Sequence, residues 1–308
     1  MKKKDVITKI RIRGTLYEKD QLKVAFVMLL PMLLATILLF ALPVFQVFEN
    51  GFTNFNLTTG NKAFNGISNY KFIFSDVKFG KACKNTFTFA FFKLLIETTL
   101  ALAIAFLLDS KIPFRKGFRA IFFVPVVVPL VASSLIWIWF YDPGLGPFNQ
   151  ILSVLGLPKC YWIYHEDTAL MSIIIFSIWK GIGYNIMLFL AGLQSIPDSY
   201  VEAAKVDGAT SLQVMFRIKI PLLRPIISFV VMIGIINTFK VFAEVNVMTP
   251  KGGPLYSTAL LVNYIYDQAF TGGKMGRACS ASVVLFIIIL GLTLIQKQLD
   301  TKKTVDLG

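Results

Sequence analysis

The sequence predicts an all-α membrane protein with six transmembrane helices and both termini in the cytoplasm. Of its 308 residues, 56% are hydrophobic and only 16% are charged, whereas an ordinary soluble domain carries about 25% charged residues. Six apolar runs have roughly the 20 residues that a helix needs to cross a bilayer core about 30 Å thick. Positive charges collect on one side of these runs, which sets the orientation.

The six runs are spaced along the whole chain. They are Val24–Val47, Thr86–Leu108, Ala120–Phe140, Ala169–Leu193, Pro225–Val247 and Ala278–Ile295. The first is longer than the apolar part of a signal peptide and no small-residue cleavage site follows it, so we expect it to span the membrane. The predicted organisation is a basic segment over 1–23, a first span, an outer loop over 48–85, a core of five spans over 86–295 and a tail over 296–308.

Counting Lys and Arg between the runs orients the chain. Nineteen lie in residues 1–23, 109–119, 195–224 and 296–308, against nine in 48–85, 141–168 and 248–277. The first set is therefore predicted to be cytoplasmic. This asymmetry explains most of the formal charge of +14 without nucleic acid, and some of the basic residues can rest on the headgroups of the lipid bilayer.

Few residues suit metal binding or catalysis, and we expect no cofactor and no metal. The single histidine, His165, lies in an outer loop beside Glu166 and Asp167, without a second ligand or nucleophile at a motif spacing. Three cysteines, Cys83, Cys160 and Cys279, fall on the outer side, where an odd count favours free thiols although pairing is chemically permitted.

Proline placement predicts one distorted span. Pro125 and Pro129 lie four residues apart in the third run, and each removes a backbone donor that lipid cannot replace. Kinks within a packed bundle are the first explanation, and bending during transport is the second.

The connection between the fourth and fifth runs, residues 195–224, is predicted to be ordered. Good helix formers follow Pro197 until Gly208 supplies a stop. Thr210, with Gln213 three residues later, forms a capping box for a second helix that ends at Pro221. Its apolar side chains cannot all be buried, which leaves a docking surface for a soluble partner or a cap on the helix ends as alternatives.

The same segment resembles a known family. Glu202-Ala203-Ala204, three residues, Gly208, nine residues and then Ile218-Lys219-Ile220-Pro221 is similar to the EAA signature of permease subunits of ATP-binding-cassette (ABC) importers, with Ile220 in place of the usual Leu. The resemblance implies a type I ABC importer fold in a bacterial plasma membrane. It assigns coupling to the ATPase to five residues, Glu202, Ala203, Ala204, Asp207 and Gly208.

Further stretches are similar to maltose-type carbohydrate permeases. They are Phe118–Asn149, Trp179–Pro221 and Met248–Phe270. The resemblance implies import of a di- or oligosaccharide, with glycerol phosphate as the alternative. It also implies three kinds of partner: a second permease, two copies of an ATPase subunit and an outer sugar-binding protein. Neither Gly60-Asn61-Lys62 nor Gly272-Gly273-Lys274 completes a P-loop, so ATP hydrolysis is expected on another subunit.

Polar residues within the runs are candidates for a substrate pathway. In the fifth run, Asn237, Lys240, Val241 and Glu244 are spaced as one helical face, and the resemblance to carbohydrate permeases places sugar contacts near Thr238 to Val241. In the fourth run, the resemblance aligns sugar contacts with Trp179, Lys180 and Gly181. A structural Lys240–Glu244 pair and plain helix packing are the alternatives.

Other membrane residues receive structural interpretations. We expect Lys93 and Glu97 to form an ion pair between helices, and Trp137, Trp139, Tyr141 and Trp162 to anchor the chain at the outer interface. An ion-coupled secondary transporter, using Lys93–Glu97 or Lys240–Glu244, and an intramembrane enzyme remain competing hypotheses.

Overall fold

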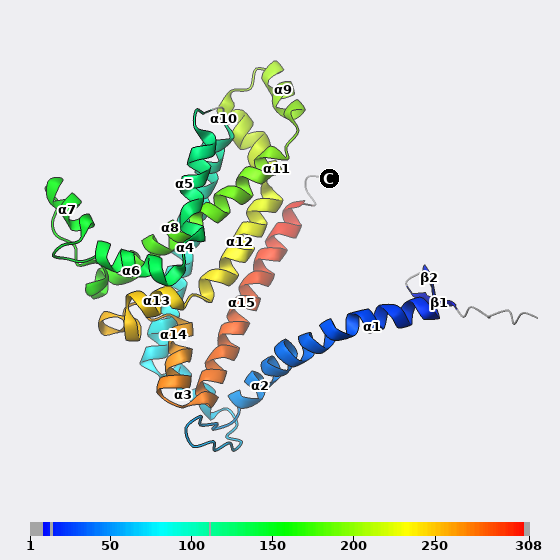
Figure 1. Ribbon diagram of the computed structural model, residues 1–308, viewed down its shortest axis with the longest axis vertical. Helices are drawn as coiled ribbons and strands as arrows, with labels where there is room; N and C mark the ends of the chain where they lie inside the picture. The colour runs from blue at the N-terminus through cyan, green and yellow to red at the C-terminus, as the bar shows by residue number, and fades with distance from the viewer. Residues whose placement is uncertain (1–8, 13–14, 111, 305–308) are drawn as a thin grey trace, which may run out of the picture.

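The computed structural model describes residues 9–12, 15–110 and 112–304, and most of them are helical. Long helices form a bundle, and the first long helix extends away from it (Figure 1). Residues 1–8 of the predicted basic segment and 305–308 of the predicted tail lie outside the described residues.

The predicted all-α fold is correct for the bundle but missed a small hairpin before it. Strands β1 (Lys9–Ile12) and β2 (Thr15–Glu18) pair antiparallel, with Lys9 opposite Glu18. The sequence of β1 alternates basic and β-branched residues, which is typical of a strand. The prediction treated residues 1–23 only as a basic segment and so did not include this strand.

The helices account for the rest of the architecture. In chain order they are α1 Lys19–Thr36, α2 Leu42–Gly51, α3 Ser68–Ser75, α4 Val77–Asp109, α5 Arg115–Val127, α6 Leu130–Phe140, α7 Pro147–Val154, α8 Glu166–Gln194, α9 Asp198–Val206, α10 Ser211–Val214, α11 Ile220–Leu222, α12 Arg224–Phe239, α13 Ala243–Met248, α14 Leu261–Tyr266 and α15 Met275–Thr304. Short π-helices cover Ile37–Ala41, Met215–Lys219 and Asp267–Thr271, and 3-10 turns cover Trp162–Tyr164, Pro250–Gly252 and Pro254–Tyr256.

Among the described residues, four helical stretches are long and apolar enough to cross a membrane, and the number becomes six if each of two bent pairs is one span. The four are Lys23–Gly51, Val77–Asp109, Glu166–Gln194 and Met275–Asp300. They cover the first, second, fourth and sixth predicted runs. The segment expected as an outer loop, 48–85, holds α3 and the first turns of α4.

The third predicted run, Ala120–Phe140, is not one continuous helix. Helices α5 and α6 meet at an angle of 100°. Val128 and Pro129 between them have extended backbone angles, because proline has no N–H with which to continue the helical ladder. The prolines therefore mark a sharp break, at Pro129, and a tolerated position inside α5, at Pro125.

The fifth predicted run, Pro225–Val247, is also interrupted. Helix α12 ends at Phe239, Lys240 leaves the helix, and α13 begins only at Ala243. At its other end α12 is bent by 64° from the preceding helical stretch, Ser211–Leu222. The predicted single helical face through Asn237, Lys240, Val241 and Glu244 is therefore wrong, since a break separates its two halves.

Helix α8 forms the centre of the bundle and packs along α4 and against α5, α12 and α13. Its side chains Ile173, Phe176 and Phe189 are fully buried. Helix α2 packs on α15, whereas the apolar window of the first predicted span has no residue buried within the chain. All three cysteines are free thiols.

Candidate functional site: a coupling segment and a polar cavity

Residues 195–224, here called the coupling segment, project from one end of the bundle as two short helices (Figure 1). Helix α9 begins after Pro197 and stops before Gly208, whose φ of 79° lies in the left-handed region that favours glycine. The predicted capping box is confirmed: Gln213 N donates to Thr210 Oγ1 at 3.3 Å, and Thr210 N donates to Gln213 Oε1 at 2.8 Å. Pro221 does not end the second helix, which continues through a π-turn to Leu222.

The coupling segment exposes an apolar surface. Of the residues predicted to contact an ATPase, Glu202, Ala203, Asp207 and Gly208 are exposed and Ala204 is buried. Five large hydrophobic side chains are also exposed: Tyr200, Val206, Leu212, Phe216 and Leu222. Because exposed apolar clusters of this kind mark contact surfaces, the segment is suited to binding another protein.

One ion pair anchors the coupling segment to the bundle. Lys219 Nζ lies 2.6 Å from Asp109 Oδ2 at the end of α4, and Arg115 of α5 lies 3.8 Å from the other carboxylate oxygen. The Lys219 and Asp109 side chains are 21% and 17% exposed, so water screens this pair less than a surface pair. The pair therefore joins the coupling segment directly to the end of α4.

A cavity of about 230 Å³ lies between α4, α8 and α12; we call it the polar cavity after the polar residues in its lining, although most of its accessible wall is apolar. It contains three predicted pathway residues, Gly181, Asn237 and Thr238, together with Lys93, Leu94, Glu97, Thr98, Tyr184, Asn185, Ile233 and Gly234. Lys93 and Gly181 stand near the middle of their long helices. The cavity is therefore at mid-membrane depth if α4 and α8 cross the bilayer.

The Lys93–Glu97 pair differs from its prediction in two ways. Both residues belong to α4, one turn apart, so the ion pair is within a helix rather than between helices. Asn185 Nδ2 of α8 donates to Glu97 Oε1 at 2.8 Å, which brings the pair to the cavity wall. A Cβ on Gly181 would lie 2.8 Å from the same Glu97 oxygen, so glycine is what this close approach requires. Sequence spacing showed the pair, but only the fold placed it beside the cavity.

Lys180 lies away from the cavity, at the break between α5 and α6. Its ammonium donates to the carbonyl oxygens of Pro125, Val126 and Val128 at 2.5, 3.2 and 2.6 Å. An ammonium has three N–H donors, and all three have acceptors here.

Trp179 belongs to an aromatic cluster beside that break. Its ring centroid is 5.2 Å from that of Trp137 and 6.1 Å from that of Phe176. Trp137 is 7% exposed and Tyr141 is fully buried, with its hydroxyl donating to the Ser172 carbonyl at 2.7 Å. The interpretation of Trp137 and Tyr141 as interfacial anchors is therefore wrong, because both pack in the protein core. Trp139, on the same helix, is 56% exposed.

The remaining pathway candidates are separated by the break after α12. Glu244, in the first turn of α13, is buried and accepts a hydrogen bond from Ser177 Oγ at 3.1 Å. Lys240 is exposed at the end of α12, Val241 packs against the aromatic cluster, and no ion pair joins Lys240 to Glu244. An exposed cation between two apolar helices points to a face covered by water or by another subunit.

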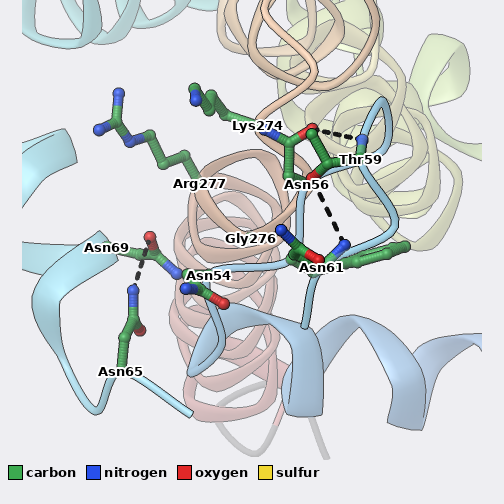
Figure 2. A pocket seen from close by; sticks show the side chains of 10 residues that line it. Asn54, Asn56, Thr59, Asn61, Asn65, Asn69, Lys274, Gly276 and Arg277 are labelled. Carbon is green, nitrogen blue, oxygen red and sulfur yellow. Dashed lines mark hydrogen bonds between the residues drawn. The ribbon is translucent and has the colours of Figure 1, made fainter. Parts of the chain in front are cut away.

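A larger pocket, of about 390 Å³, lies at the opposite end of the bundle from α9, and Figure 2 shows its asparagine-rich wall. Several of these amides hold the surrounding loop. Asn69 Nδ2 donates to the carbonyl oxygens of Gly51 and Thr53, and Asn56 Oδ1 accepts from the Thr58 backbone N–H. The Arg277 guanidinium lies 3.5 Å from the ring centroid of Phe72. None of the predicted site residues lies here.

The profile of the family described as "Binding-protein-dependent transport system inner membrane component" matches residues 97–305. The chain belongs to this family. The matched region begins at Glu97 and includes α8, the whole coupling segment and α12. This permease is therefore a multi-pass protein of the bacterial plasma membrane.

Curated relatives and a solved structure agree with this membership. The permease is 31% identical to the arabinooligosaccharides transport system permease protein AraP of Bacillus subtilis, over 88% of this chain and 86% of the relative. It is 29% identical to the sn-glycerol-3-phosphate transport system permease protein UgpA of Pectobacterium atrosepticum, over 90% and 94%.

The fold also matches a chain of a bacterial ABC transporter that imports the acidic polysaccharide alginate. The TM-score is 0.82 at 23% identity, over 92% of this chain and 96% of that chain. At this identity the likeness extends to the fold. The permease helices therefore adopt the overall arrangement of an ABC importer subunit.

Proposed function

We propose that this permease forms half of the translocation pathway of an ABC importer for a di- or oligosaccharide. In this proposal six spans cross the membrane, with α5–α6 and α12 each contributing one, and both termini and the coupling segment are cytoplasmic. A second related permease supplies the other half. Two ATPase subunits bind on the cytoplasmic side of the membrane, and a sugar-binding protein delivers the cargo to the outer side.

The exposed apolar surface of the coupling segment carries the proposal. Leu212 and Phe216 are 66% and 61% exposed on a segment that is itself ordered by a capping box and an ion pair. An ordered apolar projection without a cover within its own chain is suited to a cleft on another protein. In this role Glu202, Ala203, Asp207 and Gly208 contact the ATPase, while Ala204, which is buried, supports the segment from within.

The polar cavity supports a carbohydrate as cargo. Amide groups of Asn185 and Asn237 and the Tyr184 hydroxyl supply hydrogen-bonding partners for sugar hydroxyls, and Gly181 leaves room for the Glu97 carboxylate in the cavity wall. Trp179, which is 36% exposed and lies on the cavity-lining helix α8, offers a face for a sugar ring. Lys240 at the open end of α12 extends the pathway toward the second permease, while Lys180, Val241 and Glu244 hold its walls in position.

Two alternatives make different use of the same cavity. A glycerol-phosphate permease, as in the relative UgpA, needs an unpaired cation for the phosphate. A secondary transporter needs a titrating residue, for which the Lys93–Glu97 pair is the candidate. The second alternative leaves the exposed coupling segment unexplained.

Co-purification tests the proposed function. The permease, its partner permease and their ATPase are expressed together, and ATPase recovered with the permease is quantified in detergent. Leu212→Ser with Phe216→Ser should abolish ATPase recovery while the two permeases stay associated. Leu145→Ser with Val154→Ser, at side chains 75% and 87% exposed near α7, is the matched control and should leave recovery unchanged. Equal recovery from both double variants would refute the assignment.

A further inference from the structure

The Lys93–Glu97 pair stands where a purely structural ion pair is hard to explain. Glu97 is 6% exposed, and both charges lie in the middle of a helix that is apolar enough to cross a membrane. Buried charges lose their hydration, and only good packing and full hydrogen bonding make up for that loss. This pair instead borders an open cavity of about 230 Å³.

The groups around the pair have hydrogen-bonding capacity to spare. Each Glu97 oxygen has one partner, Lys93 or Asn185, whereas a carboxylate has roughly four acceptor positions. The Thr98 hydroxyl is buried on the same wall without a hydrogen-bond partner. Buried polar atoms are seldom left unpaired, so this wall is built for a polar occupant.

The size and chemistry of the occupant follow from the cavity. At roughly 30 Å³ for each water, the cavity of about 230 Å³ has room for about eight waters, which is the scale of one sugar ring. Adjacent hydroxyls of a ring can donate to the Glu97 carboxylate and accept from the Lys93 ammonium, since the two groups are one helical turn apart.

The charge balance decides between neutral and anionic occupants. Lys93 and Glu97 are the two charged side chains among the residues that line the cavity, and they cancel. Lys180 is engaged by three carbonyl oxygens and Lys240 is not part of the lining. A phosphate or carboxylate would therefore meet the Glu97 charge in a medium that screens weakly, without an unpaired cation.

We infer that the Lys93–Glu97 pair makes the polar cavity a subsite for an uncharged sugar ring and excludes anionic cargo. The inference rests on the proposed function and adds the charge class of the substrate. Glu97 is the specificity-determining residue, and Lys93 pairs with it when the cavity is empty.

The test measures occupancy of the cavity in the complete importer purified in detergent. Thr98→Cys, a nearly isosteric change in the cavity wall, reports occupancy through its reaction rate with methyl methanethiolsulfonate. Peptide mass spectrometry follows that site separately from Cys83, Cys160 and Cys279. The probes are glucose and glucose 6-phosphate at equal high concentration, a pair that differs by one phosphate. Size-exclusion chromatography checks that each variant assembles.

In the Thr98→Cys background, glucose should slow labelling several-fold and glucose 6-phosphate should not. Adding Glu97→Gln leaves Lys93 unpaired, so glucose 6-phosphate should then protect better than glucose. Lys93→Met with Glu97→Gln restores a net charge of zero and should restore the preference for glucose. This reversal and recovery is not expected of a pair that only stabilises the fold.

Three results would overturn the inference. Equal protection by both probes without further substitution would show that the cavity does not select by charge. An unchanged preference in assembled Glu97→Gln would remove Glu97 from that role. No protection by either probe in any variant would reject the cavity as a sugar site, whereas ATPase recovery with the coupling segment would still test the permease assignment separately.

Discussion

The ammonium of Lys180 lies 2.6 Å from the carbonyl oxygen of Val128, at the break between α5 and α6. The same group binds the carbonyl oxygens of Pro125 and Val126. Pro129 has no N–H to donate, and lipid offers no replacement. A residue of α8 therefore supplies the donors that end α5, and the 100° bend is fixed by a helix distant in sequence.

Lys180→Met should destabilise the permease. The substitution keeps the apolar stem but leaves buried carbonyl groups without a donor, at a cost of about 1–3 kcal/mol for each. The thermal midpoint of the purified importer, followed by fluorescence-detected size exclusion, should fall. Lys240→Met, which removes an exposed ammonium, is the control and should change it little. Equal midpoints for the two variants would show that Lys180 does not hold the break.

Trp137→Ala should reduce stability far more than Trp139→Ala. Both are on α6, but Trp137 is 7% exposed and packs against Trp179, whereas Trp139 is 56% exposed. Truncating a buried aromatic residue costs about 3–5 kcal/mol. The yield of folded permease in membranes, measured for both variants, checks this difference. Similar yields would restore the interpretation of Trp137 as an interfacial anchor.

Gly208→Val should impair coupling without loss of folded protein. At a φ of 79° a β-branched residue is strained by about 1–2 kcal/mol, and no atom lies within 4 Å of the position of a Cβ. The turn between α9 and α10 should shift, and ATPase recovery should fall.

Gly156→Val is the matched control for that substitution. Gly156 has a φ of 69° and equally open surroundings, but it follows α7 rather than α9. ATPase recovery should be normal for this variant. If the two variants lose ATPase equally, the effect reflects general strain rather than the coupling turn.

Asp109→Asn should uncouple ATP hydrolysis from transport. The substitution weakens the 2.6 Å contact with Lys219, through which a movement of the coupling segment would be transmitted to α4. The importer should still bind and hydrolyse ATP, but fewer sugar molecules should enter proteoliposomes for each ATP hydrolysed. Glu49→Gln, at a more exposed ion pair with Lys62, is the control. A native ratio in Asp109→Asn would exclude this contact as the connection.

Local signals in the sequence predicted the coupling segment well. Gly208 as a stop and the Thr210–Gln213 capping box depend on neighbours within a few residues, and both are present. The apolar runs located the long helices because the length of a run and its lack of charge reflect the bilayer itself.

The broken spans and the cavity depend on contacts between distant residues. Apolarity continues across Val128, so hydropathy cannot show that α5 stops there, and the polar residues around Lys240 fit one face of a continuous helix equally well. Lys180 can donate to the last carbonyl groups of α5 because α8 packs against α5. Glu97 lies in the cavity wall, where Asn185 of α8 donates a hydrogen bond to it. Trp137 is buried by side chains from other parts of the chain, so the sequence of α6 alone does not indicate its burial.

Uptake by proteoliposomes tests the central claim, that this chain is a permease half driven by a separate ATPase. The complete importer, with a loaded binding protein outside and ATP enclosed within, should accumulate an oligosaccharide. The chain alone should accumulate none, with ATP or with an imposed proton gradient. Uptake by the chain alone under a proton gradient would contradict the account and favour a secondary transporter.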